Sequence, residues 1–352
     1  MRRLAVVSWF ALVLIGCSSG SSTTSSSAPA ATAAPGAAAK PEKSSLKVGV
    51  GGQGQIIYMP LTLADALGYF KDEGLTVDIQ DLKGGADALQ AMIGGSTDLT
   101  TGFYEHTIRF QVQQKQLTMF TLFDLYPGLV LLVTKAHAND VHSIKDLKGH
   151  SVGVTAKGSS TDEMVKILAK KAGLAPDDIP VRNIGTGGDA LAAFKNPGDM
   201  WAGVTVDPAA TLMVNQGLGT VLFDTRTAQQ TKDIFGGAWP AGGFYAQSDF
   251  IRANPNTVAA LARAGVRTLK YMKSHTAEEI AAKMPPDFYA GDKATYVSAL
   301  KASLPMFSPD GVMPADGPKD VLATLTLVDP NITADKVDLK KTYDNSAVQK
   351  VR

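Results

Sequence analysis

Two stretches of the sequence repeat each other and decide the fold: LKVGVGGQGQ at Leu46–Gln55 and LKGHSVGVTAKGSS at Leu147–Ser160. In each stretch, Val-Gly-Val is typical of a short buried strand, and a loop containing glycine follows it. The first copy then predicts a helix over Pro60–Phe70, and the second a helix over Thr161–Ala172. A Gly-Leu pair after each helix predicts where it stops.

The repeat continues beyond these helices. GGADALQAMIGGSTDLTTG (Gly84–Gly102) matches GGDALAAFKNPGDMWAG (Gly187–Gly203), and each predicts a short helix followed by a short strand. Next, Tyr104-Glu105-His106 and Val206-Asp207-Pro208 each open another helix. Strands that alternate with helices form parallel sheets with right-handed crossovers. We therefore predict an α/β protein with two similar, doubly wound lobes.

Two apolar strands flank the second copy and are interpreted as a two-strand hinge between the lobes. They are Leu129–Ala138 and Gly242–Ile251. Lobe one is then predicted to comprise residues 46–138 and 239–352, and lobe two residues 139–238. The residues from Asn254 onward carry Ala, Val and Leu at helical spacing, so we expect C-terminal helices that wrap lobe one.

The N-terminus is typical of an export signal. Two arginines precede Leu4–Ile15, an apolar run too short to span a bilayer comfortably. The following Leu14-Ile15-Gly16-Cys17 resembles the bacterial lipobox. This resemblance implies that residues 1–16 are a lipoprotein signal peptide and that Cys17 is lipidated.

Residues 17–45 are predicted to be a disordered tether behind the lipidated cysteine. They are mostly Ser, Thr, Ala, Pro and Gly, and they contain nothing large and apolar to bury. We therefore expect the protein in the cell envelope, periplasmic or on the outer face of a membrane, and anchored through Cys17.

The composition excludes several classes of function. The formal net charge is +1, and no basic arm or patch indicates a nucleic-acid partner. The chain has 1 cysteine, Cys17, so the folded part can form no internal disulfide or cysteine metal site. The histidines show no metal-ligand spacing. We expect a monomer without metal or cofactor.

The strand–helix order also predicts a binding cleft. Ligands of open α/β sheets bind beyond the carboxyl ends of the strands, so two facing lobes would share one cleft. The loops that line it are residues 51–59, 103–106, 155–161, 185–188 and 204–208. The candidate ligand-binding residues are Gln53, Gln55, Tyr58, Tyr104, Glu105, His106, Ser159, Ser160, Thr161, Thr186, Asp207 and Trp239.

Several of these residues also fit a structural role. Ser160-x-x-Glu163 matches a capping box, which would use the helix N-terminus internally. Glu105 and Asp207 fit helix caps, or groups that hold a cation or the N–H groups of a heterocycle. Trp239 could line the cleft or pack against the hinge.

Taken together, these motifs resemble the substrate-binding proteins of bacterial ABC importers. Within them, the chain is similar to the group that binds nitrate, sulfonates and taurine and that includes binders of thiamine-pyrimidine precursors. The resemblance covers about residues 46–272 and rests on Pro60-Leu61-x-x-Ala64-x-x-x-Gly68-Tyr69-Phe70-x-x-Glu73-Gly74-Leu75, Gly84-Gly85 followed by Asp98 and Gly102, and Asp146-Leu147-Lys148-Gly149 before Val152-Gly153-Val154. It implies a periplasmic-binding-protein fold, hinge closure on a small solute, and an ABC transporter permease as partner.

The cleft loops favour an organic solute over a small inorganic anion such as nitrate. They contain Lys157 as their one lysine or arginine, together with the aromatic residues Tyr58, Phe103 and Tyr104. A sulfonate, taurine-like compound or carboxylate is our first expectation, and a heterocycle such as a thiamine-pyrimidine or flavin-like precursor is the alternative. An enzyme on this fold, resembling a pyrimidine synthase, is disfavoured because that resemblance calls for a Cys-rich, His-bearing site.

Overall fold

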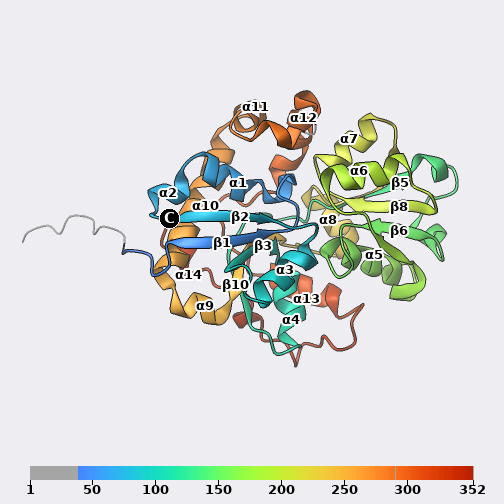
Figure 1. The fold of residues 1–352 in the computed structure, drawn as a ribbon. Coiled ribbons are helices and arrows are strands. Elements are labelled where there is room, and N and C mark those ends of the chain that lie inside the picture. The colour runs from blue at the N-terminus through green and yellow to red at the C-terminus, as the bar shows by residue number, and fades with distance from the viewer. Residues whose placement is uncertain (1–38, 290, 352) are drawn as a thin grey trace, which may run out of the picture. The chain divides into compact units, whose positions relative to one another are not determined.

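Two mixed β-sheets of five strands each form the framework of the computed structural model (Figure 1). The structure describes residues 39–289 and 291–351. The predicted signal peptide, Cys17 and residues 17–38 of the predicted tether lie outside these residues. The tether is predicted to extend to Ser45, but it ends earlier, because Glu42 accepts from the amides of Asn256 and Thr257 and Ser45 begins the first strand. Within the described residues, no helix combines the length and the apolar character needed to cross a membrane.

The first sheet belongs to lobe one. In spatial order it contains β2 (Thr76–Asp81), β1 (Ser45–Val50), β3 (Leu99–Phe103), β10 (Gly242–Gln247) and β4 (Leu117–Leu122). β1 pairs in parallel with β2 and β3, whereas β10 is antiparallel to both of its neighbours. The predicted parallel sheet is therefore mixed, because its fourth strand returns from the other lobe.

The second sheet repeats this order. It contains β7 (Val181–Asn183), β6 (Ser151–Val154), β8 (Met200–Thr205), β5 (Val130–Thr134) and β9 (Gly219–Asp224). The sequence predicts β5 as part of lobe one, and this placement is wrong: β5 pairs antiparallel with β8 and β9 in the second sheet. All its residues are buried, so its apolar pattern could not indicate which sheet it joins.

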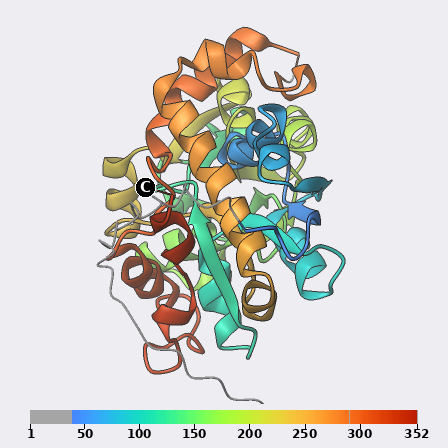
Figure 2. The same ribbon diagram turned by 90° about the vertical axis from the view of Figure 1, so that its left-hand side faces the viewer.

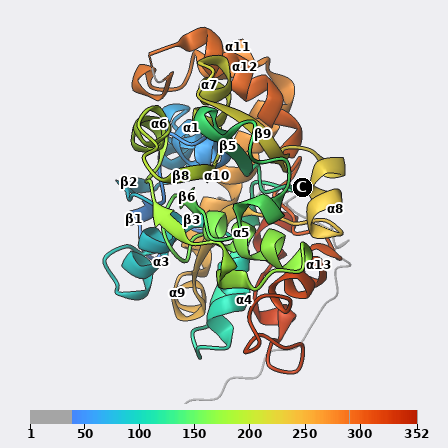
Figure 3. The same cartoon turned by 90° about the vertical axis from the view of Figure 1, so that its right-hand side faces the viewer.

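Helices cover both sheets. Lobe one carries α1 (Met59–Ala66), α2 (Tyr69–Asp72), α3 (Gly85–Ile93) and α4 (Glu105–Gln111). Lobe two carries α5 (Ser160–Lys171), α6 (Gly187–Lys195), α7 (Ala209–Asn215) and α8 (Ala228–Phe235). Figure 3 looks onto lobe two, with α6 and α7 on one side of its sheet and α5 on the other.

The predicted helices are confirmed, with one interruption. The helix expected over Pro60–Phe70 divides into α1 and α2 because Gly68 adopts a left-handed conformation with φ of 74°. The second expected helix, Thr161–Ala172, is α5 shifted by a single residue. The repeat in the sequence is thus a repeat of strand–helix units.

The C-terminal part of the chain is helical, as predicted. Its helices are α9 (Ser248–Ala253), α10 (Pro255–Ser274), α11 (Ala277–Ala281), α12 (Lys293–Ser303), α13 (Gly317–Leu325) and α14 (Ser346–Gln349). The long helix α10 packs against α1, α2, β4 and α14 of lobe one (Figure 2). α12 also contacts α7 in lobe two.

The two connections between the sheets bond to each other. Phe123 and Asp124 leave β4, and both donate their backbone N–H to the carbonyl of Gly242 at the start of β10, at 2.7 and 3.1 Å. The amide of Ala241 donates in return to the carbonyl of Asp124 at 2.9 Å. The hinge is therefore a pair of adjacent, hydrogen-bonded crossings.

Gly243 in β10 should not tolerate a side chain. A Cβ there would lie 2.3 Å from the carbonyl oxygen of Thr121 on β4. We expect Gly243→Ala to lower the free energy of unfolding by about 1–3 kcal/mol, the usual cost of overpacking. Urea unfolding of the full chain measures this.

Gly188→Ala is the matched control. A Cβ at Gly188 meets nothing within 4 Å and lies in α6, so this change should be neutral or stabilising by up to about 1 kcal/mol. Equal stability of the two variants would contradict the close packing of β10 on β4.

Candidate functional site

The two lobes meet where the carboxyl ends of their central strands face each other. Ser160, at the start of α5, donates its hydroxyl to Oε1 of Glu105, at the start of α4, with an O–O distance of 2.6 Å. The amide of Ala86 donates to Oγ of Ser159 at 2.9 Å, and Arg109 donates to the carbonyl of Gly158 at 2.9 Å. These bonds all join lobe one to lobe two, so the structure is closed.

The backbones of the two lobes also approach each other closely at this interface. A Cβ at Gly84 would lie 2.7 Å from the Cβ of Ala156 in lobe two. On the other side of the cleft, the amide of Ile56 donates to the carbonyl of Asp207 at 2.9 Å. The absence of a side chain at Gly84 is what lets the lobes approach this closely.

A cluster of buried polar side chains lies behind the contact. The hydroxyl of Tyr245 on β10 and Nδ1 of His106 share a hydrogen bond of 3.0 Å. Within the described residues, Nε2 of His106, Oε2 of Glu105 and both carboxyl oxygens of Asp124 are buried without a hydrogen-bond partner. Leaving such atoms unpaired is costly, so a native site with several of them indicates a ligand site.

Gly85 provides room beside this cluster. A Cβ there would lie 3.5 Å from Cε1 of His106, 3.7 Å from Oγ of Ser159 and 4.0 Å from the hydroxyl of Tyr58. Groups from α4, α5 and the turn before α1 thus converge on one point. We call Tyr58, Glu105, His106, Asp124 and Tyr245 the polar cluster.

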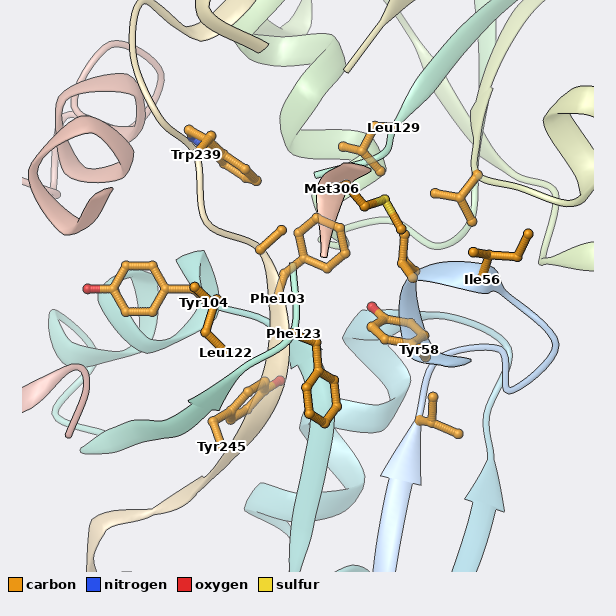
Figure 4. Close-up of a cluster of buried hydrophobic side chains, with 14 of the residues drawn as sticks. Ile56, Tyr58, Phe103, Tyr104, Leu122, Phe123, Leu129, Trp239, Tyr245 and Met306 are labelled. Atoms are coloured by element: carbon orange, nitrogen blue, oxygen red, sulfur yellow. The ribbon is translucent and has the colours of Figure 1, made fainter. Parts of the chain in front are cut away.

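Aromatic side chains form the apolar wall of the site. Phe103 lies between Tyr58 and Trp239, with ring centroids 6.3 and 6.2 Å away, and Trp239 stacks on Phe235 at 4.7 Å (Figure 4). Leu129, which precedes β5, and Met306 lie on the same side of Phe103 in the close-up. Such a wall suits a flat or ring-bearing molecule.

Burial controls the charges in the cluster. It raises the pKa of Glu105 to about 8, against the opposing effect of Arg109, and it raises the pKa of Asp124 well above its usual range. Burial lowers the pKa of His106 to about 3, and the charge of Arg109 acts in the same direction. Burial and the carboxyl groups of Asp124 and Glu105 raise the pKa of Tyr58. At neutral pH the imidazole of His106 is therefore uncharged and the carboxyl group of Glu105 is mostly protonated, and burial favours the protonated form of Asp124 as well.

A cavity opens at the rim of the cleft. It has a volume of about 470 Å³, and Gln55 and Thr186 line it from opposite lobes. At its edge, the exposed pair Lys83–Asp189 bridges the lobes at 3.1 Å. The predicted residues Gln55 and Thr186 therefore lie at the rim rather than beside the polar cluster.

Four predicted residues have their polar atoms engaged elsewhere. Gln53 bonds to Thr62 and Asp81, and Thr161 bonds to Thr155 inside lobe two. The hydroxyl of Tyr104 bonds to Thr342 and points away from Phe103 (Figure 4). Nε1 of Trp239 donates to Thr324, so this residue offers only its ring face to the site.

Asp207 is the clearest structural residue among the candidates. Its Oδ1 accepts from the amide and hydroxyl of Thr211 in α7, and its Oδ2 accepts from Arg226 at 3.0 Å and from Ser303 at 3.0 Å. The capping interpretation therefore describes its side chain. The capping box at Ser160 and Glu163 is wrong: α5 begins after Ser159 without a side-chain cap, and Glu163 faces Arg109 at 3.7 Å.

Sequence reasoning missed Asp124 and Tyr245. Asp124 follows β4, which is parallel to β3 through the shared neighbour β10, so its loop also opens at the cleft. The signal was present: Asp124 is a single acid within the apolar run Phe120–Leu125. Among the described residues, no group of three His, Cys, Asp or Glu side chains is arranged to hold a metal.

Two similar α/β lobes that close over a site through a double crossing define the periplasmic-binding-protein fold. The model of the family described as "NMT1/THI5 like" matches residues 55–279, so the chain belongs to the NMT1/THI5-like family. A solved protein of Bordetella bronchiseptica RB50 is 39% identical, with a TM-score of 0.86, and the match covers 89% of this chain and 98% of that one.

Two curated relatives are more distant. YtlA of Bacillus subtilis (strain 168), a binding protein by name, is 24% identical over 258 residues, 71% of this chain and 73% of YtlA. The 4-amino-5-hydroxymethyl-2-methylpyrimidine phosphate synthase of Candida albicans (strain WO-1) is 23% identical over 228 residues, 63% of this chain and 65% of the enzyme.

Two solved binding proteins share the fold. The alkanesulfonate-binding protein SsuA from Xanthomonas axonopodis pv. citri, bound to MOPS, is 19% identical with a TM-score of 0.68, covering 87% of this chain and 99% of SsuA. The periplasmic nitrate-binding protein NrtA from Synechocystis is 15% identical with a TM-score of 0.71, covering 89% of each chain.

Glu105→Gln should change how stability depends on pH. Above about pH 4.5 the unfolded chain releases the Glu105 proton, whereas the folded chain keeps it up to about pH 8. The wild type should therefore lose stability as the pH rises through this window, by up to about 1.4 kcal/mol per pH unit relative to the variant. Urea unfolding from pH 5 to 9 measures the difference.

The control is Glu278→Gln. Lys301 holds the pKa of Glu278 below its usual value, so this carboxyl titrates below the tested window and its variant should show a constant offset. A constant offset for Glu105→Gln as well would mean that Glu105 is ionised in the folded chain.

Proposed function

We propose that the protein is an extracytoplasmic solute-binding lipoprotein that captures a small organic, ring-bearing molecule by closure of its lobes and delivers it to an ABC transporter permease. The observation that carries this proposal is the hydrogen bond from Ser160 to Glu105 across the cleft, next to buried polar atoms without partners. A site of this kind is completed by a molecule enclosed between the lobes.

The relatives support the same class. SsuA and NrtA carry binding functions in their names and share this fold. Binding proteins of importers work outside the cytoplasm, which agrees with the predicted export signal at residues 1–16 and the predicted lipid on Cys17. A tether at the membrane would raise the local concentration of the binder near its permease.

The chemistry of the site favours a heterocycle over the sulfonate or carboxylate that the sequence puts first. Arg109 is the nearest cation, but it is engaged by the carbonyl of Gly158 and by Glu163. The first turn of α5 also carries Asp162 and Glu163, which oppose an anion at this helix N-terminus. An aromatic wall beside hydrogen-bonding groups suits a ring with polar substituents.

We further propose that the protein is not an enzyme, despite the similarity to the pyrimidine synthase. His106 is the histidine of the polar cluster; it shares a hydrogen bond with Tyr245, and its Nε2 lies 3.5 Å from Glu105. Residues 39–352 contain no cysteine to act with it. The buried cluster and the closed lobes are sufficient for capture and release.

Binding is tested by thermal unfolding of the full chain with sulfonates, taurine, nitrate, aromatic carboxylates, pyrimidines and flavins. A compound present at a hundred times its Kd should stabilise the chain by about 2.7 kcal/mol. Small-angle scattering, with and without that compound, would report closure. A folded chain that responds to no compound, and stays in one shape throughout, would refute solute capture.

Gly84→Ala should weaken closure without unfolding lobe one. Gly84 has an extended backbone with φ of −172°, which alanine adopts freely, but its new Cβ would clash with Ala156 of lobe two. With an overpacking cost of about 1–3 kcal/mol, the affinity for the compound found above should fall roughly 5- to 150-fold. Isothermal titration calorimetry measures this.

The second change Ala156→Gly removes the atom that clashes, so the double variant should recover most of the affinity. Equal affinities of the wild type and Gly84→Ala would mean that bound solute does not bring these two residues together.

Cys17 provides a separate test of anchoring. In a bacterial host, the wild type should sediment with membranes and incorporate labelled palmitate. Cys17→Ser should do neither, because the thioether that carries the lipid cannot form. Palmitate labelling of the serine variant would contradict lipidation at this residue.

A further inference from the structure

Asp124 lies at the point where both crossings and the site meet. Its backbone exchanges hydrogen bonds with Ala241 and Gly242, so the two crossings fix its position. Its side chain is fully buried, and neither carboxyl oxygen has a partner within the described residues. A Cβ at Gly242 would lie 2.1 Å from Oδ2, so glycine at that position leaves space for the carboxyl group.

The charged neighbours do not neutralise this carboxyl group. No lysine or arginine of the described chain forms an ion pair with Asp124. Arg109 is the cation closest to the cluster, and it acts on Glu105, Asp162 and Glu163. Burial and the carboxyl groups of Asp124 and Glu105 raise the pKa of the Tyr58 hydroxyl, and His106 is uncharged in the buried site. The cluster therefore offers two carboxyl groups and only one shared cation.

The two carboxyl oxygens of Glu105 have different surroundings. Its Oε1 accepts from Ser160 across the cleft, whereas its Oε2 is buried without a partner in the described chain. Nε2 of His106 is also unpartnered, although it lies 3.5 Å from Oε1. A hydrogen-bond donor brought into the cluster would thus find acceptors on Glu105, on Asp124 and, in one tautomer, on His106.

We infer that the closed cleft binds its solute as an organic cation, a protonated nitrogen base whose N–H groups are shared between the carboxylates of Asp124 and Glu105. This inference rests on the proposed solute-binding function and names its substrate class. A bound cation would keep both carboxyl groups ionised and satisfy the oxygens that the chain leaves unpaired. The rings of Tyr58, Phe103 and Trp239 would add a cation–π surface.

The test uses two compounds that differ in one group. These are 4-amino-5-aminomethyl-2-methylpyrimidine, whose aminomethyl group is protonated at neutral pH, and its 5-hydroxymethyl counterpart, which is neutral. Calorimetry on the full chain should show at least tenfold tighter binding of the aminomethyl compound. Benzamidine and benzenesulfonate form a second pair of opposite charge on one ring, and only benzamidine should bind.

Two variants locate the effect. Asp124→Asn and Glu105→Gln should each weaken binding of the aminomethyl compound at least tenfold more than they weaken binding of the hydroxymethyl compound. Both variants should remain folded, since each removes a buried carboxyl group, and thermal unfolding checks this. Asp249→Asn is the control: it removes an equal charge from an exposed pair with Arg252, far from the cluster, and should bind like the wild type.

The outcomes separate this inference from the proposed function. Equal or tighter binding of the neutral compound or the sulfonate, with closure of the lobes, would overturn the cation class and leave solute capture intact. Equal losses of affinity for the two pyrimidines in Asp124→Asn would also overturn it. Binding of no compound from these pairs or from the wider panel would overturn both proposals.

Discussion

The carboxyl group of Glu105 is the one side chain on which both closure and the interior of the site depend. One oxygen is held by Ser160 of lobe two, and the other is buried in the polar cluster. The fold fixes both partners in the same way: Glu105 follows the strand β3 and opens α4, whereas Ser160 follows β6 and opens α5. Each residue is therefore positioned by an interior strand of its own sheet. Closing the lobes places a hydroxyl from one repeat against a carboxyl group from the other.

Buried carboxyl groups without partners lower the stability of the fold, so their presence is better explained by a role in binding. A core built for stability alone would contain no carboxyl group without a partner, because each costs desolvation energy that packing does not return. Here Asp124 is held without a partner at the double crossing, and the missing side chain at Gly242 keeps space for it. The same crossing joins the lobes through backbone hydrogen bonds of 2.7 to 3.1 Å. The group that would contact the solute and the backbone that would bend on closure are thus neighbours, so binding and hinge motion share one location.

The repeat in the sequence was sufficient to predict the fold, because Val-Gly-Val strands and the glycine stops fix strand and helix order directly. It could not predict which sheet β5 joins, since a wholly buried apolar strand carries no directional pattern. The site was harder to predict for a related reason. Glu105 and Asp207 occupy equivalent positions in the two repeats, yet Arg226, Thr211 and Ser303 turn Asp207 into a structural residue, and those partners come from distant segments. The hydroxyl of Tyr104 likewise bonds to Thr342, which lies in the C-terminal region, and so is not available to the cleft. Asp124 was not predicted because the loop after β4 reaches the cleft only when β10 pairs between β3 and β4, and the sequence does not indicate this pairing.

The two repeats also differ in how the charges beside the cleft are compensated. The helix N-terminus that follows β6 offers backbone N–H groups to the cleft, and in a neutral surrounding it would attract an anion. In this chain, the first turn of α5 carries two acids: Asp162 accepts from the amide of Gly158 and from Lys166, and Glu163 faces Arg109. The positive end of the helix is therefore compensated within lobe two, and the one arginine near the site is compensated with it. Among the described residues, buried carboxyl oxygens without a partner remain on Glu105 and Asp124 in lobe one, where both oxygens of Asp124 are unpaired, and on Asp162 in lobe two, whose other oxygen is engaged. The inferred preference for a cation therefore rests on the unpaired carboxyl oxygens of Glu105 and Asp124, and not on the framework of sheets and helices that the two repeats share.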